Sequence, residues 1–179
     1  MPVPARWKTP FLVLFILLMV SEKATANPAG MRAPWPPGLT FRCNQGNFGA
    51  FSHDNPLAYY AWDFGLPLGT PVLAAAHGTI YLTGYSRNGY GNFIVIKHAN
   101  GSRSIYGHLS EMNGAIGKLV NQGEIIGYSG NTGRATGPHL HFSIIDSRGY
   151  SLPSRFEDIG VPEEGGYYRS ENCVSETLA

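Results

Sequence analysis

The fold class is decided by the stretch 92–108, NFIVIKHANGSRSIYGH, in which two apolar runs flank Asn100-Gly101. Asn-Gly is typical of the two-residue turn of a β-hairpin, because both residues tolerate the positive φ that this turn requires. The runs on either side are rich in β-branched and aromatic residues, which favour strands. The stretch therefore predicts two antiparallel strands, over 92–98 and 103–108, joined by a tight turn.

Similar short apolar runs, punctuated by glycine, occur on both sides of this hairpin. They lie at Leu39–Asn44, Pro71–Ala76, Thr79–Thr83, Glu124–Tyr128 and Leu140–Ile145. The 23 glycines and 13 prolines fit many turns, and no long segment after residue 26 has helical periodicity. We therefore expect an all-β protein, folded as a compact antiparallel β-sandwich or barrel-like domain of short strands.

Residues 1–26 have the features of a secretory signal peptide. Arg6 and Lys8 form a basic start, Phe11–Val20 is apolar, and Ala24-Thr25-Ala26 is a small-x-small cleavage site. The alternative is an uncleaved anchor. Cleavage after Ala26 predicts an exported protein, either periplasmic or extracellular.

The rest of the chain divides by composition into three parts. Residues 27–38 are rich in proline and are expected to be a linker, 39–152 form the β domain, and 153–179 form a loop-like tail. Cys43 and Cys173 are the two cysteines, and an even pair in an exported protein favours a disulfide, which would tie the tail to the first strand. The alternative is two unrelated thiols.

The charge balance bears on the binding partners. Loss of residues 1–26 reduces Lys+Arg from 13 to 10 and Asp+Glu from 12 to 11, for a net charge of about −1. Nucleic-acid binding would need a basic stripe, and anionic lipid would need a polybasic run. We expect a monomer that binds neither nucleic acid nor, after signal cleavage, a membrane.

The chemistry is concentrated in the histidines. His139 and His141 lie two residues apart in Gly137-Pro138-His139-Leu140-His141, so on a strand both side chains point to one face. A catalytic zinc ion takes three protein ligands, usually histidines and a carboxylate. His53 and Asp63 are the candidates to complete such a set. The alternatives are solvated histidines at a strand end and an aspartate in a capping or ion-pair role.

Several motifs, in order, resemble those of the lysostaphin-type (LytM-like) zinc metallopeptidases that cut bacterial peptidoglycan. They are Phe51-Ser52-His53, Ala61-Trp62-Asp63-Phe64, Gly69-Thr70-Pro71-Val72, Ala74-Ala75-Ala76-His77-Gly78, Tyr90-Gly91-Asn92, Tyr106-Gly107-His108-Leu109, Ser129-Gly130-Asn131-Thr132-Gly133 and Gly137-Pro138-His139-Leu140-His141-Phe142. The resemblance covers about Gly46 to Asp146. It implies the duplicated hybrid motif type of β fold, and one Zn²⁺ bound by His53, Asp63 and His141. His108 and His139 match the two site histidines of that family that are not ligands.

One spacing departs from the family pattern. Many relatives have His-x-x-x-Asp, but the residue four before Asp63 is Tyr59. His53 can be the ligand only if Asp54–Ala58 bulge out as a loop. Asp54 is the rival oxygen ligand.

The resemblance implies a zinc metalloendopeptidase that hydrolyses peptide cross-links of peptidoglycan. A histidine must move the proton, because the chain has no His-Glu-x-x-His motif. We expect His139 to be the general base and His108 its partner, with the Gly-rich stretch 129–137 forming one wall of a substrate groove. The alternatives are an inactive relative that binds cell wall or activates an amidase, and a phosphocarrier-like module, which the signal peptide argues against.

Overall fold

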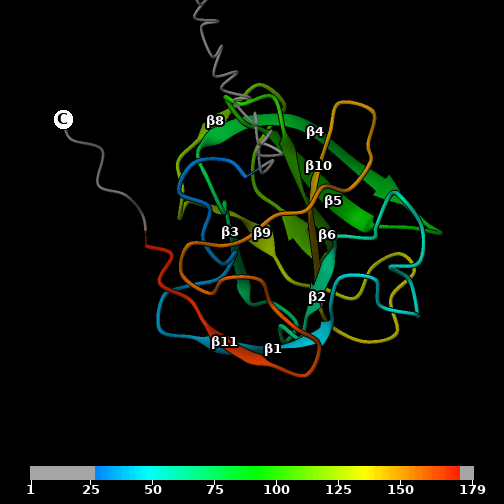
Figure 1. Ribbon diagram of the computed structural model, residues 1–179. Helices are drawn as coiled ribbons and strands as arrows, with labels where there is room; N and C mark the ends of the chain where they lie inside the picture. Colours follow the sequence, from blue (N-terminus) through cyan, green and yellow to red (C-terminus); the bar gives the residue numbers. More distant parts are fainter. Residues whose placement is uncertain (1–26, 174–179) are drawn as a thin grey trace, which may run out of the picture.

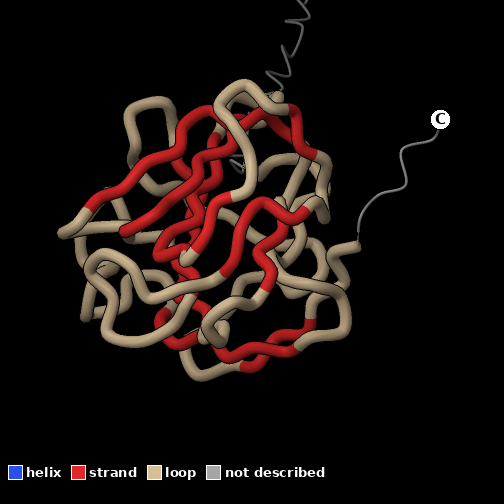
Figure 2. Tube along the Cα trace, turned by 180° about the vertical axis from the view of Figure 1, so that it is seen from behind, coloured by secondary structure: helices blue, strands red, loops and turns tan. Residues whose placement is uncertain are grey.

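The structure, a computed structural model, describes residues 27–173, and it is built from strands and loops (Figures 1 and 2). The predicted signal peptide and its cleavage site lie outside these residues. The strands are β1 (Thr40–Gln45), β2 (Trp62–Phe64), β3 (Pro71–Leu73), β4 (Gly78–Ser86), β5 (Gly91–Lys97), β6 (Arg103–Leu109), β7 (Glu111–Met112), β8 (Leu119–Val120), β9 (Ile125–Tyr128), β10 (Leu140–Ile145) and β11 (Tyr167–Arg169). Between residues 27 and 173 there is no helix of the length and hydropathy that a membrane span requires.

The strands form two antiparallel sheets. The larger has the order β11-β1-β2-β10-β6-β5-β4-β8, and the smaller has the order β3-β9-β7. The hairpin predicted around Asn100-Gly101 joins β5 and β6. Gly101 has a positive φ of 84° but Asn100 does not, and the Gly101 N–H donates to the His98 carbonyl at 3.0 Å, so the turn is not the two-residue type. The prediction of an all-β antiparallel fold is therefore confirmed.

The main core is a single cluster that draws residues from both sheets. Val72 and Ile126 come from the small sheet, and Ile94, Tyr106 and Phe142 come from the large one, all without solvent exposure. Burial stabilises the fold by about 1.5–3 kcal/mol for each such aliphatic or phenylalanine side chain. This core fixes β10 and β6 rigidly, and the polar face of these strands carries the site described below.

The segment 27–38 differs from the linker that its proline content predicts. It contains no strand, but Met31, Ala33 and Trp35 are at most 1% exposed and belong to the main core. The Trp35 ring packs edge-on against Phe64 of β2, with 4.8 Å between ring centroids. Because the segment buries large apolar side chains, it is an integral part of the domain.

The predicted Cys43–Cys173 disulfide is absent, and both cysteines are free. The tail does return to the first strand, but it does so through hydrogen bonds between β11 and β1 (Figure 1). In this antiparallel register the backbone N–H of Cys43 donates to the carbonyl of Gly166, at 2.9 Å. The chain then runs away from Cys43, so Cys173 lies well past it. The disulfide prediction was wrong. The tail does lie beside the first strand, but its register places Arg169 opposite Thr40, so Cys173 is not opposite Cys43.

Candidate metal centre and active site

Three neighbouring strands place the centre of the site. Asp63 is the middle residue of β2, His141 stands opposite it on β10, and Gly107 stands opposite His141 on β6. A Cβ atom on Gly107 would come within 3.3 Å of the His141 Cβ and 3.4 Å of the Tyr90 Cβ. Glycine at this position therefore lets the Tyr90 ring pack against the His141 ring, with 5.0 Å between centroids.

Three histidines surround the Asp63 carboxylate. Its Oδ1 atom lies 2.9 Å from Nδ1 of His141, 3.4 Å from Nε2 of His53 and 3.8 Å from Nε2 of His139. Burial alone raises the pKa of Asp63, but the hydrogen bond from His141 and the neighbouring His53 outweigh burial and hold the pKa well below its usual value. The carboxylate is therefore ionised at neutral pH.

The loop between His53 and Asp63 bulges as the spacing requires. The backbone N–H of His53 donates to the Gly49 carbonyl at 3.0 Å, and the N–H of Phe48 donates to the Tyr59 carbonyl at 2.7 Å, which closes the loop on itself. The His53 side chain is fully buried, whereas the neighbouring Asp54 is exposed and lies outside the cluster. The longer spacer thus delivers His53 to Asp63 and leaves the rival residue in solvent.

Backbone carbonyls fix the proton positions of three of the histidines. Each Nδ1 lies 2.8 Å from a carbonyl oxygen: His53 from Gly46, His108 from Thr132 and His139 from Gly137. A carbonyl can only accept, so each Nδ1 carries the proton and donates it. In the neutral ring the lone pair is then on Nε2, the atom free to bind a metal or accept a proton.

His108 is held in an uncommon backbone conformation. Its φ is +60°, and its N–H donates to the Tyr90 carbonyl at 2.6 Å. This geometry brings its ring to 4.5 Å from the ring of His139, centroid to centroid. Burial, and then the charge of His139, lower the pKa of His108 to about 4. His108 is therefore neutral at pH 7.

The cluster fits a tetrahedral metal ion. His53, Asp63 and His141 each offer a ligand atom, and these three atoms lie within 4.8 Å of one another. Ligand atoms about 2.0–2.1 Å from a tetrahedral zinc ion lie about 3.3 Å apart, close to the 3.4 Å between His53 and Asp63. Nε2 of His53, the atom that faces Asp63, is also buried without a hydrogen-bond partner. Buried polar atoms rarely lack a hydrogen-bond partner, and a bound cation would satisfy the lone pair of such a nitrogen atom.

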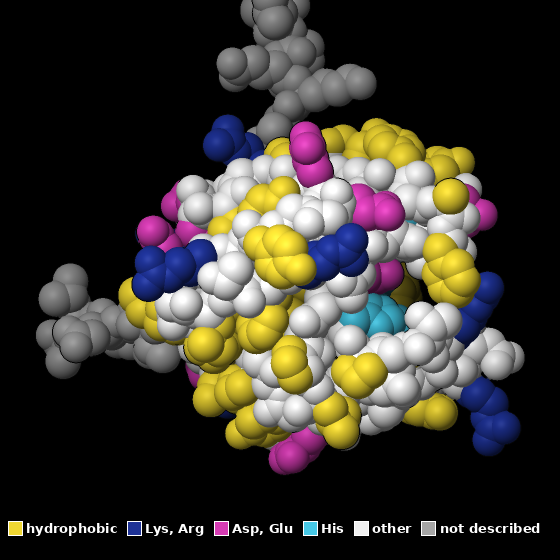
Figure 3. Space-filling view, turned by 90° about the horizontal axis from the view of Figure 1, so that it is seen from below, with side chains coloured by type: hydrophobic (Ala, Val, Ile, Leu, Met, Phe, Trp, Pro, Cys, Tyr) yellow, Lys and Arg dark blue, Asp and Glu magenta, His cyan; other side chains and the backbone are white. Residues whose placement is uncertain are grey.

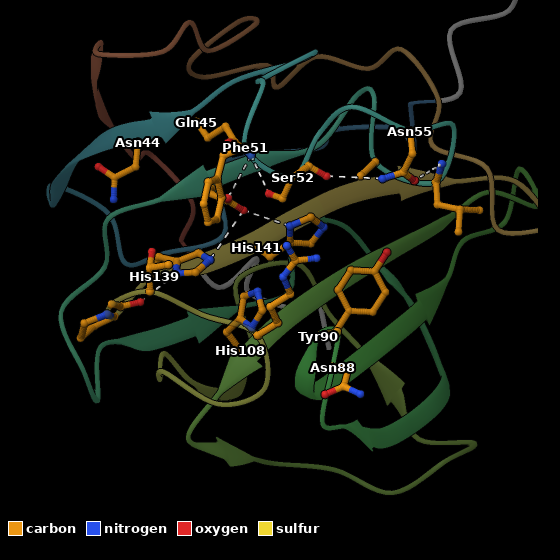
Figure 4. Close-up of a pocket in the computed structure, with 18 of the residues that line it drawn as sticks. Asn44, Gln45, Phe51, Ser52, Asn55, Asn88, Tyr90, His108, His139 and His141 are labelled. Atoms are coloured by element: carbon orange, nitrogen blue, oxygen red, sulfur yellow. Dashed lines mark hydrogen bonds and ion pairs between the residues drawn. The ribbon is translucent and has the colours of Figure 1, made fainter.

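The site lies in an open cleft of about 650 Å³. Figure 3 shows the histidines at the floor of a hollow in the surface. In Figure 4, Asn44 and Gln45 lie on one side of His139, His141 and His108, and Tyr90 and Asn88 lie on the other. The lining residues come from the loop around residues 51–58, the ends of β1 and β6, Asp63 of β2, His141 of β10, the turn 88–90, the stretch 134–139 and Glu164.

The expected groove wall from the Gly-rich stretch is present, since Arg134, Thr136 and Gly137 line the cleft. Sequence reasoning gave no role to Tyr90, Arg134 or Glu164, which also line it. Tyr90 belongs to one of the matching motifs. Nothing in the sequence around Arg134 or Glu164 separates them from ordinary surface charges.

Comparison with known proteins now identifies the family. The family model described as Peptidase family M23 matches residues 58–153, more than half of the chain. The chain belongs to peptidase family M23. The M23 match contains Asp63, His108, His139 and His141, whereas His53 precedes it. The assignment of His53 therefore depends on the geometry above.

Three M23-type relatives illustrate the similarity. The DD-carboxypeptidase/endopeptidase Mpg of Neisseria meningitidis is 51% identical over 80 residues, 45% of this chain and 18% of Mpg. The peptidoglycan DD-endopeptidase ShyA of Vibrio cholerae is 45% identical over 84 residues, 46% of this chain and 19% of ShyA. The solved catalytic domain of lysostaphin from Staphylococcus simulans has a TM-score of 0.50 and 36% identity, covering 60% of this chain and 79% of that one. The chain thus spans about a fifth of the length of the two curated relatives.

Proposed function

We propose that this M23 peptidase is an exported zinc metalloendopeptidase that hydrolyses peptide cross-links of bacterial peptidoglycan. The observation that carries the proposal is the convergence of the buried His53 with Asp63 and His141, two residues that line an open cleft together with His108 and His139. The names of Mpg and ShyA, both endopeptidases, support the reaction class, and the name of ShyA supports peptidoglycan as the substrate.

In this proposal His53, Asp63 and His141 hold one zinc ion. When bound, zinc would supply a Lewis acid and lower the pKa of a bound water to about 7. The protein holds the ligand side chains ready for the metal, because the Gly46 carbonyl orients the His53 ring and the ionised Asp63 offers a negative ligand.

His139 and His108 handle the proton. The bond of His139 to the Gly137 carbonyl leaves Nε2 as a proton acceptor, 3.8 Å from Asp63, so His139 acts as the general base. His108 is neutral, and its Nε2 accepts rather than donates a hydrogen bond. This protonation state favours His108 as the residue that orients the attacking water over a role as donor to an oxyanion.

The test combines metal analysis with digestion of peptidoglycan by the protein that begins at Asn27. We expect one zinc ion per chain and release of cross-linked peptides, and we expect His141→Ala and Asp63→Ala to lose both zinc and cleavage. His53→Ala should also lose zinc, whereas Asp54→Ala, the matched control, should keep it. The opposite result for this last pair would contradict the ligand assignment. A zinc-loaded protein that binds peptidoglycan without cleaving it would support the inactive, wall-binding alternative.

Export is tested separately. The sequence of residues 1–26 motivates cleavage after Ala26, so N-terminal sequencing of protein from the exported fraction should begin at Asn27. Exported protein that retains Met1 would contradict the proposal of a cleaved signal.

A further inference from the structure

Among the described residues, one arginine lies on the walls of the cleft, Arg134. Its backbone N–H donates to the Gly89 carbonyl at 2.9 Å, which places Arg134 on the wall that also carries Asn88 and Tyr90. The acidic residue Glu164 also lines the cleft, and its backbone nitrogen lies 3.2 Å from where a Cβ atom on Gly46 would stand.

Arg134 is free to bind a ligand. It is exposed, and within residues 27–173 it forms no ion pair. Three arginines elsewhere on the surface are engaged: Arg32 pairs with Glu171, Arg148 pairs with Asp146, and Arg103 lies over the ring of Tyr81 at 4.1 Å. An unpaired guanidinium in a substrate cleft is suited to an anionic group of the substrate.

The backbone that carries Arg134 is rigid. The preceding Gly133 has a φ of +73°, and a Cβ there would clash with the backbone nitrogen of Gly91. Thr132 donates its hydroxyl to the Leu109 carbonyl at 2.8 Å and accepts the N–H of Asn92 at 3.0 Å. The Thr132 carbonyl also orients His108. The same fixed loop therefore sets the positions of Arg134 and of a histidine at the reaction centre.

The chemistry of an amide limits where an anion can stand beside the cleaved bond. The residue on the acyl side has its main-chain carboxyl group in that bond, so a free main-chain carboxylate can come only from the residue on the amine side. Some cross-links are made through the side-chain amine of a diamino acid. If the carbon that bears this amine also bears a carboxylate, that carboxylate stays free beside the cleaved bond. A glycine bridge continues as a peptide and has none.

Building on the proposed function, we propose that Arg134 binds a free carboxylate on the amine side of the cleaved amide. The guanidinium matches a carboxylate with two parallel hydrogen bonds, which a neutral amide cannot accept. The enzyme then prefers cross-links made through a diamino acid that keeps this carboxylate over glycine bridges. Arg134 is thus a specificity-determining residue of the cleft.

The experiment compares two cross-linked peptides that differ only at this group, a carboxylate in one and a carboxamide in the other. For the zinc-loaded protein beginning at Asn27 we expect kcat/KM to be about 10- to 100-fold higher for the carboxylate, the range for a hydrogen bond to a charged group. Arg134→Gln should abolish this preference, and Arg134→Lys, a point charge, should restore part of it. Arg155→Gln, which removes an exposed arginine outside the cleft, should leave the preference intact.

A second readout separates this inference from the proposed function. The amine-side product peptide, carrying the carboxylate, is titrated calorimetrically into the wild-type protein and into Arg134→Gln, and the variant should bind it at least about 10-fold more weakly. Equal cleavage of both peptides by the wild type, or equal product binding by the two proteins, overturns the role of Arg134. Failure of the zinc-loaded wild type to cleave either peptide overturns the peptidase function, while the binding comparison still decides the inference.

Discussion

Three backbone carbonyls determine what the histidines at the cleft can do. The carbonyls of Gly46, Thr132 and Gly137 each accept a hydrogen bond from the Nδ1–H of one ring, which leaves the lone pair of the neutral ring on Nε2. The same residue type then serves two purposes. His53 lies against the Asp63 carboxylate, whereas His108 and His139 stand beside each other, where the proposed mechanism uses them for proton transfer.

Removal of either proton-handling ring should separate chemistry from metal binding. We expect His108→Ala and His139→Ala to keep zinc and fold, because neither residue belongs to the three-ligand cluster. Cleavage of peptidoglycan cross-links should fall by about 10²- to 10⁴-fold, the range for a lost acid or base. Zinc content, thermal stability and cleavage rate are measured together for each variant. Near-normal cleavage by both variants would rule out the histidine mechanism.

The two cysteines should react very differently. Cys43 is fully buried, its thiol donates to the Gln45 carbonyl, and burial raises its pKa to about 12, so little of the reactive thiolate is present. Cys173 is exposed. Alkylation of the native protein should modify Cys173 alone, and alkylation in denaturant should modify both, as read by intact mass and peptide mapping. Resistance of both to alkylation in denaturant without reductant would contradict the free-thiol structure.

At the scale of single residues, the sequence predicts the histidines of the site better than it predicts Arg134, the residue proposed to contact the substrate. His139 and His141 share a motif whose spacing alone puts them on one face. His53 was predictable only with a loop whose closure depends on hydrogen bonds such as that from Phe48 to Tyr59. Arg134 could not be singled out, because its place in the cleft depends on a contact with Gly89 that no local pattern shows.

At the scale of the elements, glycine at position 133 makes possible the tight packing of the loop 129–137 against Gly91 of β5. Gly133→Ala combines an unfavourable φ with a clash against backbone, whereas Gly101→Ala, the matched control, has a φ of +84° and nothing within 4 Å. The control should lose about 1–2 kcal/mol of unfolding free energy, the cost of the left-handed conformation for alanine. Gly133→Ala should lose more.

Urea denaturation of both glycine variants measures this difference. Because Thr132 orients His108, Gly133→Ala should also reduce cleavage, while Gly101→Ala should not. Equal losses of stability in the two variants would show that the loop yields to the added methyl group.

Strand prediction worked where a run was long enough to show a pattern. The β5–β6 hairpin and β10 follow directly from their apolar runs and from Asn100-Gly101. β7 and β8 have two residues each, and β11 has three, so no periodicity can reveal them. Their pairing with β9, β4 and β1 is set by tertiary contacts. The buried segment 27–38 was misread because proline content says nothing of the Trp35 environment.

For the whole molecule, the buried histidines predict a loss of stability in acid. His108 has a folded pKa of about 4, and burial also lowers the pKa of His141, against an unfolded value near 6.5. The unfolded chain therefore binds protons first as pH falls, so stability is complete above about pH 6.5 and declines toward pH 4. Asp63, whose pKa is depressed, adds stability above about pH 4 that is lost as pH falls further.

This pH dependence is measured by urea denaturation between pH 8 and pH 4, with a chelator present so that release of metal does not contribute. His108 alone can account for at most about 3 kcal/mol, from its shift relative to 6.5. His108→Gln should remove that part of the decline. A free energy of unfolding that stays constant between pH 7 and pH 4 would contradict the assigned neutral histidines.

The pairing of β10 with β2 and β6 has one more consequence. Side chains alternate between faces along a strand, so a slip of β10 by one residue would put Leu140 or Phe142 where His141 stands and turn His141 into the core. Such a chain could have its full complement of strands and still be unable to collect zinc. Metal binding would therefore depend on the register of β10, and a measurement of bound metal would show whether the sheet has formed with His141 opposite Asp63.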